Sequence, residues 1–168
     1  MDELFRITVQ FLLVVSGILW IGGGLYTLFV QTPALLAAPP QARGPVLGQI
    51  IPRQVNYLLR LGEITVGLGI LNVFASGKAR LLEDALGSRW AIAIIIGAIL
   101  GIVLLALGHA VIKPSALRLL DVGPRAASGD AAAGAEMGAI LARLRTMGYA
   151  QIALGLLIVA FMVLARFS

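Results

Sequence analysis

Four long apolar stretches alternate with polar and proline-containing segments along the chain. A helix rises about 1.5 Å per residue, so roughly 20 mostly apolar residues cross a hydrocarbon core about 30 Å thick. Each stretch must be helical, because lipid offers no partner to unpaired backbone groups. The pattern predicts an all-α integral membrane four-helix bundle, a single membrane domain over residues 1–168. The predicted spans are approximately 8–32, 55–75, 90–112 and 147–165.

Prolines mark the predicted ends of two spans. Pro33, Pro39, Pro40 and Pro45 follow the first span, and Pro114 follows the third. Because proline lacks a backbone N–H and its ring crowds the preceding helical turn, we expect these residues to break or stop their helices.

Polar and small residues fill the remaining connections. The polar segment 78–89 separates the second and third spans, with Gly77 and Gly87 as expected helix caps. Alanine, glycine and one proline dominate 121–136, which we expect to be a mobile loop. We expect 137–145 to form a short amphipathic turn that leads into the fourth span.

Short sequences recur at equivalent places in the two halves of the chain. The first span ends VQTPAL (30–35) and the third ends VIKPSAL (111–117). The sequences EITVGL (63–68) and QIALGL (151–156) lie in the second and fourth spans. Two explanations stay open: a pseudo-repeat of two helical hairpins, or coincidence among a few residue types.

Composition supports the membrane prediction. Hydrophobic residues make up 60% and charged residues 12%, against about 45–50% and 25% in soluble domains. The absence of cysteine excludes disulfides, thiolate metal sites and cysteine nucleophiles. The acidic start, with Asp2 and Glu3, is not typical of a secretory signal peptide. The net charge of +5 lies at span ends, where anionic lipid headgroups explain it, so no nucleic-acid partner is expected.

Basic residues give a prediction of orientation. We call the membrane face that holds both predicted ends of the chain face A, and the opposite face, face B. Face A carries Arg6, Lys78, Arg80, Arg89 and Arg166. Face B carries Arg43, Arg53, Lys113, Arg118, Arg125, Arg143 and Arg145. The positive-inside rule favours face B as cytoplasmic. We therefore expect a prokaryotic inner or plasma membrane with loops 33–53 and 113–146 in the cytoplasm.

The second span carries polar residues at helical spacing. Arg53, Asn56, Arg60, Glu63 and Gly67 follow steps of three and four, which places them on one helix face. Arg60 lies about 8 Å and Glu63 about 12 Å from the start of the span. Charges at such depth are costly, so we expect both to face the bundle and to form an i,i+3 ion pair. The alternative is that the pair, with Asn56, only fixes helix register.

The single histidine, His109, lies about one turn from the face-B end of the third span, with Lys113 one turn further on. A lone histidine is more often a hydrogen-bonded interior residue than a ligand, and both roles stay open. One histidine cannot supply bis-histidine haem ligation within one chain. Single-histidine ligation, or a haem shared between two protomers, stays open.

These polar groups, together with Gln31, all belong to the face-B half of the membrane. They predict a net-positive funnel that opens on face B and suits an anionic or amphipathic small molecule. The candidate ligand-binding residues are Arg53, Asn56, Arg60, Glu63, His109, Lys113 and Gln151.

Glycines indicate close helix packing. Gly22, Gly23 and Gly24 are consecutive in the first span, and Gly97 and Gly101 form a GxxxG pattern in the third. Small residues let membrane helices approach closely. The alternative for the first three is a hinge or a slot for a flat ligand.

The first span's Trp20-Ile21-Gly22-Gly23-Gly24, the exit at Pro33 and the glycine-rich second span with basic residues at its entry resemble the copper-resistance-D (CopD)-like four-helix membrane domains. The related haem-pathway protein HemJ, a protoporphyrinogen oxidase, is similar in size and hydropathy. The resemblance implies a small membrane protein that handles copper or haem.

The chain departs from that pattern in its ligands. The group's copper- or haem-handling members resemble one another in a first-span histidine, which is absent here. Cysteine is absent, and Met1, Met137, Met147 and Met162 form no cluster for copper(I). Only His109 carries over, as a candidate haem ligand, and no metal site is predicted.

Three functions follow in order of preference. The first is transport or handling of an anionic or amphipathic molecule, with Arg53 and Arg60 binding charge and Glu63 balancing it or relaying a proton. The second is a haem- or porphyrin-binding redox protein with His109 as axial ligand. The third is an anchor or assembly subunit, as a homo-oligomer or with a membrane partner subunit. The sequence places no serine or threonine beside a base, so nothing indicates hydrolysis, and no catalytic residue is predicted.

Overall fold

The computed structural model describes residues 3–77 and 88–167, and helices form nearly all of this part of the chain. Four helical segments in it are long and apolar enough to cross a membrane. They cover Glu3–Ala37, Gly44–Ala75, Arg89–Ala127 and Ala131–Arg166. The predicted all-α four-helix bundle is therefore confirmed, and the chain is described as a multi-pass membrane protein.

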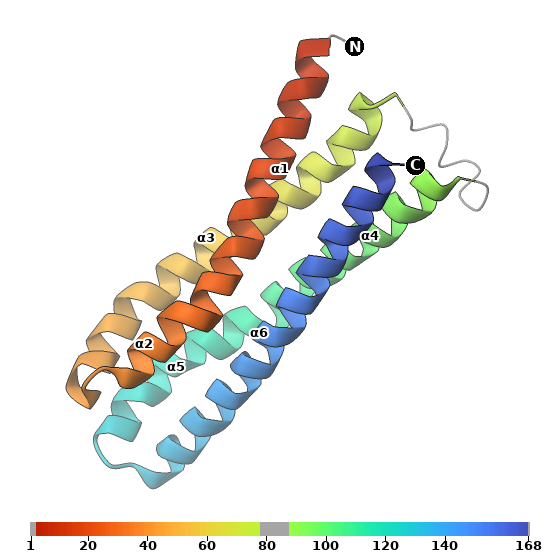
Figure 1. Cartoon of the computed structure of the whole chain (residues 1–168). Coiled ribbons are helices and arrows are strands. Elements are labelled where there is room, and N and C mark those ends of the chain that lie inside the picture. The colour runs from red at the N-terminus through yellow and green to blue at the C-terminus, as the bar shows by residue number, and fades with distance from the viewer. Residues whose placement is uncertain (1–2, 78–87, 168) are drawn as a thin grey trace.

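Two helical hairpins build the bundle (Figure 1). The first hairpin consists of α1 (Glu3–Tyr26), the π-helical turn η1 (Thr27–Gln31), α2 (Thr32–Ala37) and the returning α3 (Pro40–Ala75). The second consists of α4 (Arg89–Leu107), the π-helical turn η3 (Gly108–Ile112), α5 (Lys113–Ala127) and the returning α6 (Ala131–Arg166). Helix α1 packs mainly against α3, and α4 packs mainly against α6.

Both hairpins accommodate a proline through a π-helical turn. The N–H of Thr32 donates to the carbonyl of Thr27, and the N–H of Lys113 donates to the carbonyl of Gly108. Pro33 and Pro114 each follow directly after these wide turns, which make room where a proline ring would otherwise crowd an α-helical carbonyl. The prediction that these prolines stop their helices was therefore wrong. The turns occupy the same position in both hairpins, which favours the pseudo-repeat over coincidence.

The second span begins earlier than expected. The chain reverses at Ala38 and Pro39, and α3 then continues from Pro40 to Ala75 with Pro45 inside it. Pro40 occupies the first helical turn, where a missing N–H costs nothing, so it starts the helix rather than breaking it. Most of 33–53, expected as a loop, is helical.

The segment 121–136 was also predicted wrongly as a loop, because α5 runs to Ala127 and α6 begins at Ala131. Its alanines have the highest helix propensity. Gly129 takes a positive φ of 92° in the short connecting turn, and the Asp130 carboxylate accepts from the N–H of Ala133 at 3.0 Å, capping α6. Residues 137–145 continue α6, so the expected loop 113–146 is helical except for this turn.

The expected polar connection between the hairpins falls largely on residues 78–87, outside the described residues, and Gly87 is among them. Gly77 takes a φ of 72° directly after α3. This conformation is typical of a glycine cap, as predicted.

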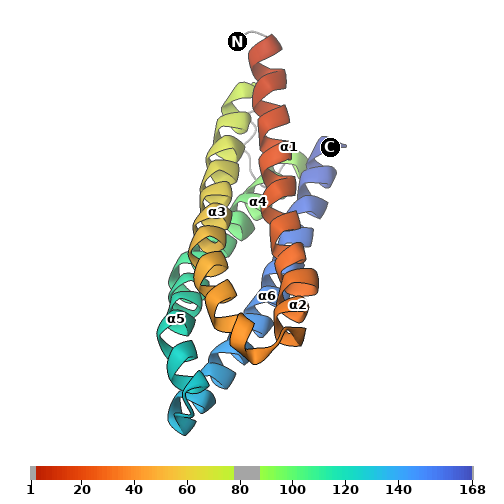
Figure 2. The same ribbon diagram turned by 90° about the vertical axis from the view of Figure 1, so that its left-hand side faces the viewer.

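Helices α3 and α6 have 36 residues each, or about 54 Å, which exceeds the hydrocarbon thickness of about 30 Å. Figures 1 and 2 show α5 and the start of α6 extending past the α2–α3 turn, away from the ends of the chain. A hydrophobic core of its own holds this extension together. It contains Ile51, Ala116 and Leu119, packed against Leu47, Val55, Leu120, Met137, Ile140, Leu141 and Leu144.

The glycine prediction holds in part. A Cβ at Gly23 would lie 2.6 Å from a Leu58 methyl group, and one at Gly97 would clash with the Met162 methyl group, so both glycines are close-packed against side-chain ends that would have to shift. Gly101 is in ordinary contact, whereas Gly22 and Gly24 face open space, so they are not packing sites.

Two close-packing glycines escaped the prediction. A Cβ at Gly62 would lie 2.7 Å from the Trp20 ring, and one at Gly108 would lie 2.8 Å from Leu59. These contacts seal the interior between α1, α3 and α4.

Candidate functional site

Glu63 joins the two hairpins through a charged cluster. Its Oε2 lies 3.1 Å from Nη1 of Arg60, which confirms the predicted i,i+3 pair. Its Oε1 lies 3.2 Å from Nε2 of His109, which the turn η3 presents to α3. We call Arg60, Glu63 and His109 the Arg–Glu–His cluster.

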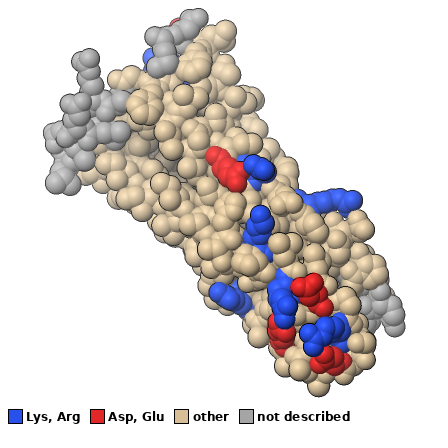
Figure 3. Space-filling view, turned by 180° about the vertical axis from the view of Figure 1, so that it is seen from behind, with Lys and Arg blue, Asp and Glu red and all other residues tan. Residues whose placement is uncertain are grey.

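The cluster lies on the outside of the bundle. Exposed side-chain fractions are 79% for Arg60, 37% for Glu63 and 43% for His109. The expectation that both residues face inward was wrong for Arg60, whereas Glu63 is half-buried and reaches His109 of the second hairpin. The inward face of α3 is filled by buried Leu59, Leu61 and Gly62. Figure 3 shows charged side chains gathered toward the lower end of one outer face, the face-B end.

The other predicted ligand residues do not converge on this cluster. Arg53 is exposed and donates to the backbone and side-chain oxygens of Gln49 at 3.3 and 2.9 Å. Asn56 is exposed, and Lys113 and Gln151 are half-buried. Within the described residues, no hydrogen bond or ion pair joins any of them to the cluster. The predicted funnel opening on face B is therefore not assembled from these residues within one chain.

A network of amides connects the first hairpin instead. Gln54 Nε2 donates to Gln31 Oε1 at 2.7 Å, and Gln31 Nε2 donates to Gln54 Oε1 at 3.0 Å. Gln54 Nε2 also donates to the Thr27 hydroxyl. Gln54 escaped the sequence analysis because it lies in a segment expected to be outside the span. The available signal was Gln31, since an amide in an apolar span needs a polar partner.

An open groove lies over this network, between α1 with η1 and α3, with a volume of about 680 Å³. Polar groups line one part of it and apolar groups the other, so it matches a molecule with a polar head and an apolar tail. The groove is lined by Gly23, Tyr26, Gln31, Gln49, Ile50, Arg53, Gln54, Tyr57 and Leu58.

Arg53 and Leu58 lie at different heights along α3. Counted from Ala75, Arg53 lies about 33 Å along the helix and Leu58 about 26 Å. If a hydrocarbon core about 30 Å thick begins level with Ala75, Arg53 falls just outside it and Leu58 within it.

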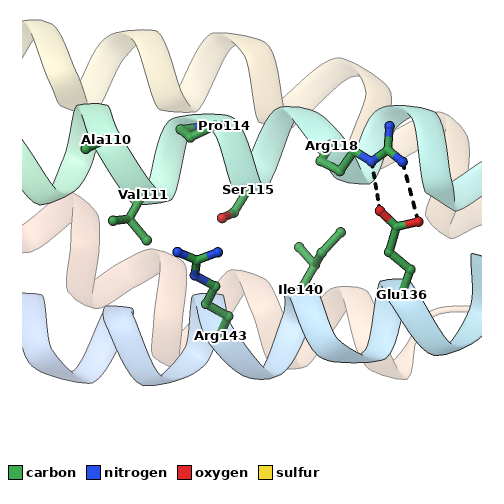
Figure 4. Close-up of a pocket in the computed structure, with 8 residues that line it drawn as sticks. All are labelled: Ala110, Val111, Pro114, Ser115, Arg118, Glu136, Ile140 and Arg143. Atoms are coloured by element: carbon green, nitrogen blue, oxygen red, sulfur yellow. Dashed lines mark hydrogen bonds and ion pairs between the residues drawn. The ribbon is translucent and has the colours of Figure 1, made fainter.

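A second, smaller hollow of about 330 Å³ separates α5 from α6 (Figure 4). Arg118 at one end is held by Glu136 at 2.8 Å and lies 3.8 Å from Asp121. The Arg143 guanidinium at the other end is directed toward Ser115. Because Glu136 and Asp121 already compensate the charge of Arg118, this hollow is a weaker anion site than the groove.

The haem hypothesis gains no geometric support. The Nε2 atom of His109 faces Glu63, and Leu58 lies against Gly23, the one glycine of Gly22–Gly24 that lines the groove. In the two described ranges, no three His, Asp or Glu side chains gather as a metal site.

Comparison with known proteins gives no relationship: no protein family, curated protein or solved structure matches the chain.

Proposed function

We propose that this membrane protein binds an anionic amphiphile, which enters the groove between α1 and α3 sideways from the face-B leaflet. The observation that carries this proposal is the groove itself, with a guanidinium at headgroup depth above an apolar floor. The proposal keeps the predicted ligand class and moves the site from the bundle interior to its lateral surface.

Arg53 supplies the charge for the headgroup. Its guanidinium is exposed and is held toward the groove end of α3 by Gln49. A guanidinium presents five N–H donors in a planar fork, and the two accepting oxygens of Gln49 leave others for a phosphate or carboxylate. Tyr26 and Tyr57 flank the same groove, and tyrosines favour the membrane interface.

Gly23 and Leu58 form an apolar floor for the chain of the ligand. Glycine at position 23 leaves room for the Leu58 side chain, because a Cβ there would come too close to it. The groove is open rather than enclosed, so a lipid-like molecule can enter from the bilayer without any helix moving.

Lipid titration followed by native mass spectrometry tests the proposal. Delipidated protein in detergent is titrated with phosphatidylglycerol or phosphatidylcholine of identical acyl chains. We expect tighter binding of phosphatidylglycerol, and a roughly ten- to hundredfold loss of that preference in Arg53→Gln, the range for losing a charged hydrogen bond.

Arg143→Gln is the matched control, because Arg143 is another exposed face-B arginine and lies outside the groove. Loss of preference in Arg143→Gln but not in Arg53→Gln would overturn the proposal. Oleate and glycerol phosphate distinguish the ligand class. Binding of oleate indicates a carboxylate amphiphile, and equally tight binding of glycerol phosphate alone would contradict a role for the apolar floor.

The third predicted function, assembly, is favoured by a different observation. Arg60 is outward-facing on a helix that is long and apolar enough to cross the membrane. Exposed charge at this depth indicates a protein neighbour.

A further inference from the structure

We propose that two copies of this chain associate in the membrane through the outer face of α3, with Arg60 and Glu63 of each copy pairing with Glu63 and Arg60 of the other. The interface residues are Asn56, Arg60, Glu63 and Gly67, which we call the α3 stripe. The ligand groove opens on the α1 side of α3. None of the four stripe residues lines it, although the groove residue Arg53 belongs to the same helix face as the stripe.

Arg60 and Glu63 lie well inside the membrane-spanning part of α3. Counted from Ala75, Glu63 lies about 18 Å and Arg60 about 22 Å along α3, so both fall within a hydrocarbon core about 30 Å thick. Charged side chains at such depth almost always face protein or a water-filled cavity. The interior of the bundle is closed to them, so the partner must come from outside.

The Arg60 guanidinium and the Glu63 carboxylate retain hydrogen-bonding capacity that the described part of their own chain does not use. Within the described residues, Arg60 uses a single nitrogen, Nη1, in its one ion pair, and its side chain is 79% exposed. A guanidinium has five N–H donors, so most of its donors point away from the chain that carries them. The Glu63 carboxylate, shared between Arg60 and His109, retains lone pairs for a further donor.

Charge complementarity selects a second copy as the occupant. The α3 stripe carries one positive and one negative residue about 4.5 Å apart along the helix. A two-fold axis along the membrane normal places the two α3 helices side by side at the same depth. Each Arg60 can then reach diagonally to the partner's Glu63, about one turn away along the helix. Two-fold interfaces are self-complementary in this sense, and they are the commonest in homo-oligomers. A purely anionic or purely cationic partner would offer a counter-charge to only one of the two residues.

Shape supports the same occupant. Gly67 is exposed, and a Cβ added there would meet nothing within 4 Å. A small residue one turn from an intramembrane charge lets two helix backbones approach closely enough for short contacts. Asn56 is exposed at the other end of the stripe, where an amide can donate to its own copy across the axis.

Cysteine cross-linking tests the contact directly, because the chain contains no native cysteine. Gly67→Cys places a single thiol at the proposed interface, and Val159→Cys places one on the exposed outer surface of α6 as a control. Oxidation in native membranes should give a disulfide dimer with Gly67→Cys and not with Val159→Cys. Equal cross-linking of both, or of neither, would overturn the proposal.

Charge reversal tests the pairing. Mass photometry in nanodiscs should show a dimer for the native chain. Arg60→Glu alone and Glu63→Arg alone should each weaken the dimer roughly tenfold or more, because like charges then face one another across the axis. The double variant Arg60→Glu/Glu63→Arg restores opposite charges and should recover it. A monomeric native chain, or a double variant no more dimeric than the single variants, would contradict the pairing. Circular dichroism confirms that each variant is folded.

Discussion

The contact between Gly62 and Trp20 allows a stability prediction with a worked magnitude. Adding one methyl group in Gly62→Ala places a carbon 2.7 Å from two atoms of the Trp20 ring and 3.1 Å from the Leu105 methyl. Carbon atoms prefer about 3.5–4.0 Å, so a rigid indole has to move by close to 1 Å. Overpacking of this kind costs about 1–3 kcal/mol. The gain in helix propensity is about 1 kcal/mol, so we expect a net loss of up to about 2 kcal/mol, and a stability about 1–3 kcal/mol below that of a glycine-to-alanine change in open space.

Unfolding in detergent, followed by tryptophan fluorescence and circular dichroism, measures this loss. Gly69→Ala is the control, because a Cβ there meets only Leu13 at 3.9 Å, and it should leave stability unchanged or slightly raised. Trp20→Phe removes the ring atoms nearest Gly62, so Gly62→Ala should cost less in that background. If Gly62→Ala is as stable as Gly69→Ala, the close approach of α1 and α3 is not what the structure describes.

Three other predictions concern separate parts of the chain. Gln54→Leu leaves the half-buried Gln31 amide without its partner and should lower the free energy of unfolding by about 1–3 kcal/mol; unchanged thermal stability would contradict this. The N–H of Ala133, and then Arg125, hold the pKa of Asp130 below its ordinary value of 3.8. The stability from Asp130 is present above pH 3.8 and is lost as pH falls through the lowered pKa, so unfolding of Asp130→Asn should depend less on pH below about 4 than that of the native chain. On titration with haemin, the native chain and His109→Ala should give the same Soret band, because Nε2 of His109 is already paired with Glu63.

Hydropathy predicted the helices and their number because lipid forces apolar segments into helices of a minimum length. It could not predict where those helices end in water. Helix α3 starts at Pro40, well before the expected start near residue 55, and its early part packs through Leu47 and Ile51 in a core with Leu119, a tertiary contact that hydropathy does not reveal. Alanine-rich segments such as 131–136 lack hydrophobic periodicity, so composition alone did not separate helix from loop.

The Arg–Glu–His cluster was predicted in its residues but not in its direction, whereas Arg53 is the one predicted ligand-binding residue that lines the groove. Helical spacing was sufficient to pair Arg60 with Glu63, since both lie on one helix. Their direction required knowing which face of α3 packs, and Gly62 and Leu59 decide that through contacts with other helices. The inward prediction also assumed that one chain must shield its own charges, which a neighbouring molecule can do equally well.

The π turn η3 sets the direction in which the side chains of α5 point around the helix axis. A π turn holds one residue more than an α turn, and one residue corresponds to about 100° of rotation around the axis. If Gly108–Ile112 kept all its residues but wound as an ordinary α-helix, α5 would rotate by about that angle. Val122 and Leu119, now buried, would turn away from their present neighbours. Deleting one residue within η3 would instead remove the wide turn and leave α5 close to its present direction, so the turn absorbs one extra residue and keeps α4 and α5 aligned.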